Sequence, residues 1–161
     1  MSGGGDGAAA LVIGIGNPLR GDDGVGWWLA RRARRLRPAP AVRLVQQATP
    51  ELAAEVAAAR RLLVVDAWHP VAPGAEAGPC LRPLVAAAAG SASSHGLAAA
   101  ELVAVARLLW PRTRVEGWEL LVPAACFHHG PGLSPELRRW LPRAEALLRQ
   151  WGATGGISGD A

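Results

Sequence analysis

Residues 11–26 read Leu-Val-Ile-Gly-Ile-Gly-Asn-Pro-Leu-Arg-Gly-Asp-Asp-Gly-Val-Gly, and the rest of the chain is organised around them. The run 11–15 is short, apolar and rich in β-branched side chains, which predicts a buried strand. Glycines, an asparagine and a proline then interrupt the strand and indicate a loop. Apolar residues resume at helical spacing from Val25, so Asp22 and Asp23 fall where a central strand is followed by a helix.

The two aspartates have a structural and a functional interpretation. A carboxylate at the start of a helix accepts backbone N–H bonds and suits the positive end of the helix dipole, so either residue could be a cap. However, Gly21, Gly24 and Gly26 surround the pair, and a glycine inside a helix costs about 1 kcal/mol relative to alanine. Because glycine lets a backbone or a ligand approach closely, this spacing favours a functional site.

Nucleotide-binding motifs fit the same stretch poorly. The dinucleotide fingerprint needs a third glycine where this chain has Leu19, and Arg43-Leu-Val45 stands where an acidic residue is expected. A phosphate-binding P-loop needs a lysine, and the chain contains none. A small nucleotide-binding module is therefore the least favoured of the functions considered.

The segment Gly14-x-Gly-Asn-Pro-Leu-Arg-Gly-Asp-Asp-Gly-Val-Gly26 resembles the N-terminal signature of the hydrogenase maturation endopeptidases. The resemblance implies an aspartic-type endopeptidase that removes the C-terminal extension of a nickel–iron hydrogenase large-subunit precursor after nickel insertion. It also implies that the nickel is supplied by that precursor. Gln46-Gln-Ala-Thr49 stands where many members carry Asp-Gly-Gly-Thr, and this departure is similar to the branch that serves NAD-linked bidirectional hydrogenases.

Length and composition indicate how many domains the chain has and whether it is a membrane or secreted protein. The chain has 161 residues, of which 50% are hydrophobic, and this suits one domain with a buried core. No apolar run reaches the ~18 residues that span a bilayer, and the N-terminus lacks the basic region of a secretory signal. We therefore expect a soluble, cytoplasmic monomer with no membrane partner. Cys80 and Cys126 form no C-x-x-C pair and are expected to be reduced, inert thiols.

The net charge of +4 is carried by arginines, several of which follow one another in the first predicted helix, at positions 31, 32, 34, 35 and 37. Few aromatic residues accompany them and no nucleic-acid motif is present, so we expect no nucleic-acid partner. A solvated helix face, with cations near the negative end of the dipole, explains the cluster most simply. A contact surface for an acidic protein partner is the alternative.

Strands alternate with helices along the chain. Further strands are predicted over residues 42–45, 61–66, 80–84 and 113–122, and the prolines of 80–84 indicate an edge strand. Helices are predicted from residue 25, over 50–59 and over 97–109. A last helix is predicted to begin at a Ser134 cap, and Pro142 should kink or split it. This pattern predicts a single α/β domain over residues 11–151, with a mostly parallel twisted sheet of about five strands and helices on both faces. Residues 1–10 and 152–161 are expected to be disordered tails.

Three polar residues are expected at the carboxyl ends of the strands, where ligands bind in such sheets. Asp23 follows the first strand, Asp66 ends the third, and His95 precedes a later helix. Two carboxylates and an imidazole suit a borderline divalent metal such as nickel or zinc, and three protein ligands leave coordination positions open. His69 is a weaker candidate for the same site, and His128 and His129 are more simply explained as surface residues.

The resemblance extends to these residues. In the maturation endopeptidases, an acidic residue of the first loop, an aspartate after the third strand and a histidine before a later helix bind the metal, and these positions match Asp23, Asp66 and His95. The contexts Val64-Val-Asp-Ala67, Ser94-His-Gly-Leu97 and Gly132-Leu-Ser-Pro-Glu136 are also similar to the family pattern. A non-catalytic, metal-sensing chaperone of hydrogenase assembly is the alternative function.

Overall fold

The computed structural model describes residues 10–69, 78–84 and 98–154. Strands and helices alternate over most of this length, as the sequence predicts. The strands are β1 (Ala10–Ile15), β2 (Ala41–Val45), β3 (Arg61–Trp68), β4 (Cys80–Pro83) and β5 (Glu116–Pro123). The helices are η1 (Gly21–Gly24), α1 (Val25–Ala33), η2 (Pro50–Leu52), α2 (Ala53–Ala58), α3 (Ala99–Leu109), α4 (Pro135–Arg138) and α5 (Leu141–Thr154), where η marks a short 3₁₀ helix.

The strands form one sheet in the order β2-β1-β3-β5-β4. β1, β2, β3 and β5 are parallel, and β4 pairs antiparallel with β5 at the edge. The predicted α/β class, the mostly parallel five-stranded sheet and the edge position of β4 are therefore confirmed. The loops that follow β1, β3 and β5 leave the sheet at the same side, and this shared side is called the carboxyl edge below.

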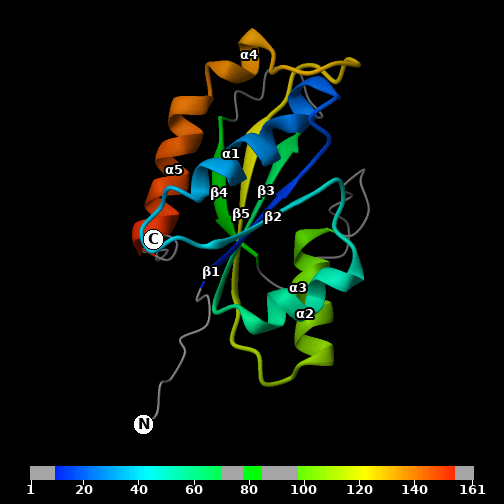
Figure 1. Cartoon of the computed structure of the whole chain (residues 1–161), viewed down its shortest axis with the longest axis vertical. Helices are drawn as coiled ribbons and strands as arrows, with labels where there is room; N and C mark the ends of the chain where they lie inside the picture. The colour runs from blue at the N-terminus through cyan, green and yellow to red at the C-terminus, as the bar shows by residue number, and fades with distance from the viewer. Residues whose placement is uncertain (1–9, 70–77, 85–97, 155–161) are drawn as a thin grey trace.

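Two apolar layers sandwich the sheet, so the predicted helices on both faces are confirmed (Figure 1). One layer joins the sheet to α2 and α3 through residues such as Leu62, Val64 and Leu102. The other joins it to α1 and α5 through residues such as Leu63 and Leu29. Leu62, Leu63 and Val64 are neighbours on β3 and alternate between the two layers, as side chains of a strand covered on both faces must.

Several element boundaries differ from the sequence expectation. β3 continues to Trp68, so Asp66 lies inside the strand rather than at its end. α5 continues to Thr154, so residues 152–154 are helical, whereas the sequence analysis assigned them to a disordered tail. Pro142 splits the last helical region, because α4 ends at Arg138 and α5 begins at Leu141. Ser134 is the expected cap: its hydroxyl oxygen accepts the Leu137 N–H at 3.2 Å.

None of the helices in the described ranges is long and apolar enough to cross a membrane.

Candidate active site

Asp22 joins three segments of the carboxyl edge. One carboxylate oxygen accepts the N–H groups of Ala125 (2.8 Å) and Cys126 (3.0 Å), which follow β5, and the Ser134 hydroxyl (2.7 Å). The other oxygen accepts the Ser134 N–H at 2.6 Å. The side chain of Asp22 is completely buried. It therefore clamps η1 to the loop after β5 and to the start of α4.

The pKa of Asp22 reflects this clamp. Burial alone would raise the pKa, but the hydrogen bonds from Ser134, Ala125 and Cys126 outweigh it and hold the pKa below the usual value of an aspartate. The interpretation of Asp22 as a cap of the following helix is wrong, since neither η1 nor α1 has a side-chain cap bond. Its partners lie more than a hundred residues along the chain.

The glycines around the aspartates have a packing role. A Cβ on Gly26 would collide with the backbone carbonyl of Ile15 and would lie 2.6 Å from the carbonyl oxygen of Val65. α1 thus begins in direct contact with the backbones of β1 and β3, and only glycine leaves room for this approach. Gly16, with φ of 138°, lies against the Asp23 carbonyl in the same way. These glycines let the backbone approach closely, which positions Asp23 beside the strand ends.

The structure brings Asp23 and Asp66 together at the carboxyl edge. Asp23 is 7% exposed, and one of its carboxylate oxygens accepts the Asn17 N–H at 2.8 Å. Asp66 lies near the end of the adjacent strand and is partly buried. Since Leu62 and Val64 face α2 and α3, Asp66 faces the same side of the sheet.

The pKa of Asp66 is raised to about 7. Desolvation by burial is the largest cause, and the negative charges of Asp23 and Glu119 add to it. A single hydrogen bond from the Ala67 N–H, at 2.8 Å, acts in the opposite direction. Asp66 therefore carries a carboxyl group that exchanges its proton near neutral pH, beside a second carboxylate. Such a pair is a frequent sign of a functional site.

His95, the third predicted ligand, lies outside the described residues, and the three-residue site is therefore untested. Within the described ranges, no group of three or more His, Cys, Asp or Glu side chains is placed to hold a metal ion. Without a third ligand, Asp23 and Asp66 supply only part of the coordination that a divalent cation needs. A metal held by a second molecule could use both of them.

Of the other histidines, His69 follows β3, and His128 and His129 follow β5, at the same edge of the sheet. His69 is exposed and its ring contacts that of Phe127 edge-on, with the ring centroids 5.4 Å apart. His128 is exposed, and its Nδ1 lies 3.1 Å from Sγ of Cys126. His129 is exposed, as predicted.

The sequence analysis did not identify two pairs of side chains that interact, Cys126 with His128 and Glu119 with Arg82. Cys126 and His128 are two residues apart in the loop after β5, a spacing that places side chains on one side of an extended backbone. That signal could have found them. Glu119 of β5 raises the pKa of Asp66 and is itself paired with Arg82 of β4 at 2.5 Å. The Glu119–Arg82 pair depends on antiparallel register, which local sequence patterns do not specify.

The fold was compared with those of known proteins, and several solved structures are similar to it. No protein-family model matches the chain, and no curated protein matches it. The structure is similar to the NiFe hydrogenase maturation protease HycI from Thermococcus kodakarensis KOD1, with 22% identity, coverage of 91% of each chain and a TM-score of 0.64. It is similar to the NiFe hydrogenase maturation protease HybD from Thermococcus kodakarensis, with 20% identity, coverage of 89% of this chain and 98% of the other, and a TM-score of 0.67.

A third similar structure is the hydrogenase maturating endopeptidase HybD from E. coli. The identity is 20%, the alignment covers 89% of this chain and 93% of the other, and the TM-score is 0.64. At this level of sequence identity the similarity is one of fold. Function depends on the residues of the site and does not follow from the fold. The chain thus has the α/β fold that these hydrogenase maturation proteases share.

Proposed function

We propose that this chain is an endopeptidase that removes the C-terminal extension of a nickel–iron hydrogenase large-subunit precursor after nickel insertion. The similarity of fold supports a role in hydrogenase maturation. One observation carries the proposal of peptidase chemistry: the pKa of Asp66 is raised to about 7, in part by the negative charge of Asp23 at the same edge of the sheet. A carboxyl group with this pKa can accept and donate a proton at neutral pH.

Nickel is part of the substrate in this proposal, held by the precursor's own ligands. Asp23 and His95 would complete its coordination, since carboxylate and imidazole groups suit a borderline divalent metal, and Asp66 would stay uncoordinated in the step that breaks the amide. A precursor without nickel leaves Asp23 and His95 without a metal to coordinate, and it is therefore bound and cleaved less well. The departure at Gln46-Gln-Ala-Thr49 favours a precursor of the NAD-linked bidirectional class.

Asp66 is the group that we propose to move the proton. In its ionised form it takes a proton from the attacking water, and in its protonated form it gives that proton to the leaving nitrogen, so that one water adds across the scissile amide. The nickel of the substrate would supply Lewis acidity toward the scissile carbonyl. Asp23, through its negative charge, helps to keep the pKa of Asp66 near neutrality.

The test measures cleavage of the substrate that the proposal names. Purified chain is mixed with a hydrogenase large-subunit precursor in its nickel-loaded and nickel-free forms, and the intact masses of the products are determined. We expect the loaded precursor alone to lose its extension. We expect Asp66→Asn to slow cleavage by about 10²- to 10⁴-fold, the usual contribution of a general acid–base group. Glu116→Gln, an exposed carboxylate at the opposite end of β5, is the matched control and retains full activity.

Two outcomes contradict the proposal in different ways. Binding of loaded precursor without any change in its mass would identify a metal-sensing chaperone that cuts nothing. Cleavage at the normal rate by both Asp66→Asn and His95→Ala would show that another set of side chains performs the reaction. In either case the fold and the Asp22 clamp stand unchanged.

A further inference from the structure

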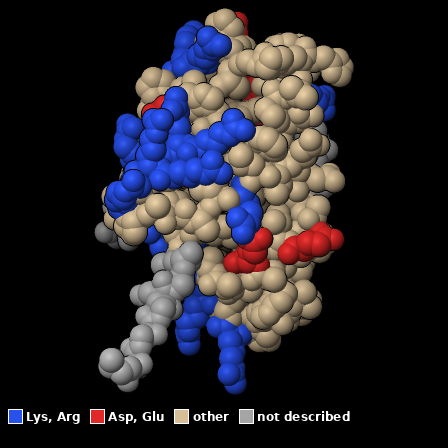
Figure 2. Space-filling model, viewed as in Figure 1, with Lys and Arg blue, Asp and Glu red and all other residues tan. Residues whose placement is uncertain are grey.

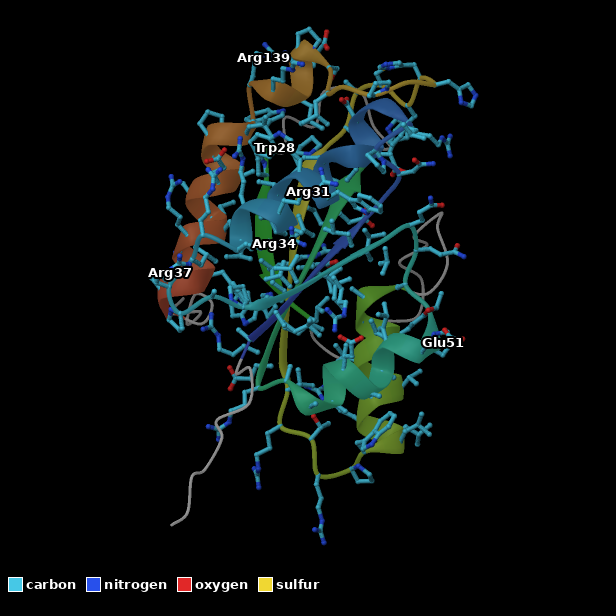
Figure 3. The ribbon with its side chains drawn as sticks, viewed as in Figure 1. Trp28, Arg31, Arg34, Arg37, Glu51 and Arg139 are labelled. Carbon is cyan, nitrogen blue, oxygen red and sulfur yellow. The ribbon has the colours of Figure 1, made fainter. Side chains whose placement is uncertain are left out.

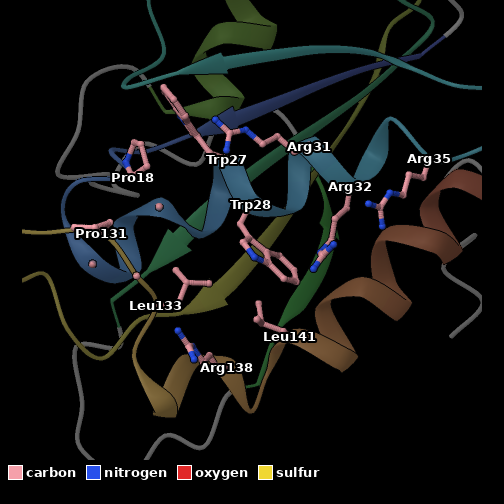
Figure 4. A pocket seen from close by; sticks show the side chains of 13 residues that line it. Pro18, Trp27, Trp28, Arg31, Arg32, Arg35, Pro131, Leu133, Arg138 and Leu141 are labelled. Atoms are coloured by element: carbon pink, nitrogen blue, oxygen red, sulfur yellow. The ribbon is translucent and has the colours of Figure 1, made fainter.

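A groove lies between α1 and the segment that carries α4 and the start of α5, on the opposite face of the sheet from α2 and α3 (Figures 1 and 4). Its volume is about 670 Å³. Trp27 and Trp28 form part of one wall, and Leu133 and Leu141 form part of the other. One end of the groove is lined by Gly21 and Gly24 of η1, the same turn that carries Asp23.

The groove is strongly cationic. Arg31, Arg32, Arg35 and Arg138 line it, and no acidic residue does so among those that the structure describes. Figure 2 shows the resulting patch of positive charge over α1, and Figure 3 shows Arg31 and Arg34 projecting from the same region. The charge is concentrated here and is not spread evenly over this face of the molecule.

Three of these arginines have no countercharge among the described residues. Arg32 is paired with Glu145 at 3.2 Å. Arg31, Arg35 and Arg138 are exposed, and none forms an ion pair within the described part of the chain. The positive charges of these guanidinium groups repel one another, and an anionic ligand would relieve this repulsion.

The tryptophans of the groove are fixed by contacts within the chain. The guanidinium carbon of Arg32 lies 3.6 Å from the ring centroid of Trp28, and that of Arg31 lies 5.8 Å from the ring centroid of Trp27. The Trp27 indole N–H donates a hydrogen bond to the Val45 carbonyl at 2.9 Å. The Trp28 face covered by Arg32 is therefore not free to stack on a nucleic-acid base, and the aromatic rings instead make this wall of the groove rigid and apolar.

We propose that this groove docks an acidic peptide segment of a protein partner, with carboxylates bound by Arg31, Arg35 and Arg138 and an apolar side chain placed against Trp28 and Leu141. Guanidinium groups bind carboxylates through two parallel hydrogen bonds, and the arginines lie on both walls of the groove, as required for a segment bound between them. The proposal concerns binding and goes beyond the proposed cleavage. It holds whether or not the bound partner is cut.

The experiment measures binding to the full chain by fluorescence anisotropy. The probe is a labelled peptide of about twelve residues, rich in Asp and Glu, with one central Leu, and its Asn/Gln counterpart is the neutral comparison. The double variant Arg31→Gln/Arg35→Gln is compared with Arg112→Gln/Arg114→Gln, which removes the same charge from exposed sites beyond α3. We expect the first variant to bind the acidic peptide about five- to tenfold more weakly and the second to bind within about twofold of the unmodified chain.

Several results would overturn the proposal. One is equal binding of the acidic and neutral peptides, and another is an equal loss in the two double variants, which would mean that net charge alone attracts the peptide. Tighter binding of a labelled oligothymidylate than of the acidic peptide would identify a nucleic-acid surface instead. Since peptide binding is measured without cleavage, a failure here is distinguishable from a failure of the proposed peptidase activity.

Discussion

Replacing Asp22 by asparagine should destabilise the fold strongly, although the two side chains have the same shape. Asparagine has one acceptor oxygen where aspartate has two. Its best placement keeps that oxygen at the position that accepts the Ala125, Cys126 and Ser134 hydroxyl bonds. The amide nitrogen then lies where an oxygen now accepts the Ser134 N–H at 2.6 Å, so two donors face one another.

The cost of Asp22→Asn can be worked out from these contacts. Two buried donors, the Ser134 N–H and the amide group of the new asparagine, are left without an acceptor at about 1–3 kcal/mol each, and the bonds that remain no longer have a charged acceptor. Movement of the loop after β5 would recover part of this. We expect the free energy of unfolding to fall by about 3–5 kcal/mol, a large share of the total stability of a domain of this size.

The assay is denaturant unfolding followed by tryptophan fluorescence. Asp23→Asn is the matched control: Asp23 accepts one bond, from the Asn17 N–H, which an asparagine oxygen can still accept. Its unfolding free energy should stay within about 1 kcal/mol of the unmodified chain. An Asp22→Asn variant that is equally stable would refute the clamp.

Acid provides a second check on the same clamp. The pKa of Asp22 is held below its unfolded value, so the stabilisation is present above that value and is lost as the pH falls through the folded pKa. The ordinary pKa of an aspartate side chain is 3.8. The difference between the unmodified chain and Asp22→Asn should therefore be constant at neutral pH and shrink below about pH 4. A difference that persists unchanged in acid would mean that the variant is destabilised by something other than lost carboxylate bonds.

Three further predictions concern Asp66, Gly26 and Ser134. The pKa of Asp66 is raised from 3.8 to about 7, so the protonated form favours folding and its contribution is lost as the pH rises through this window; the loss is at most about 4 kcal/mol. Asp66→Asn should abolish this decline, and pH-dependent unfolding curves that coincide for the two proteins would contradict the raised pKa. Gly26→Ala should cost about 1–3 kcal/mol in unfolding free energy, because its Cβ meets backbone atoms, whereas Gly152→Ala should be better tolerated because its Cβ meets the flexible end of Leu36. Ser134→Ala should cost about 1–3 kcal/mol, since it removes both a bond to Asp22 and the cap of α4, and thermal melting curves measure this.

The architecture was predictable because local signals determine it. A parallel strand buried on both faces is a continuous apolar run, as in Leu62–Val65, and prolines at the predicted fourth strand indicated an edge. The position of Asp23 after β1 followed from the same reasoning. The end of β3 did not, since Asp66 and Ala67 extend the strand only because β5 lies alongside to pair with them.

The contacts that arrange the site were not predictable in this way. Asp22 looked like a helix cap because the sequence shows its neighbours along the chain, whereas its hydrogen-bond partners are Ala125, Cys126 and Ser134. The same holds for the raised pKa of Asp66, which depends on burial and on the charge of Glu119 from another strand. The pattern Gly-Asp-Asp-Gly alone does not show that Asp22 accepts four hydrogen bonds from distant residues while Asp23 accepts one from Asn17.

The clamp connects the proposed reaction to the proposed docking groove. Asp22 binds Ser134, the residue after the groove's Leu133, and the Gly21 N–H donates to the Gly130 carbonyl at 3.0 Å, so these bonds hold the two walls together. Loss of the clamp should therefore weaken peptide docking and cleavage together, even under conditions where the variant is folded. Asp23→Asn should impair cleavage and leave docking unchanged, and Arg31→Gln/Arg35→Gln should do the reverse with a short substrate that does not reach the groove. If all three variants lost both properties in the same proportion, the groove and the aspartate pair would have to be one site.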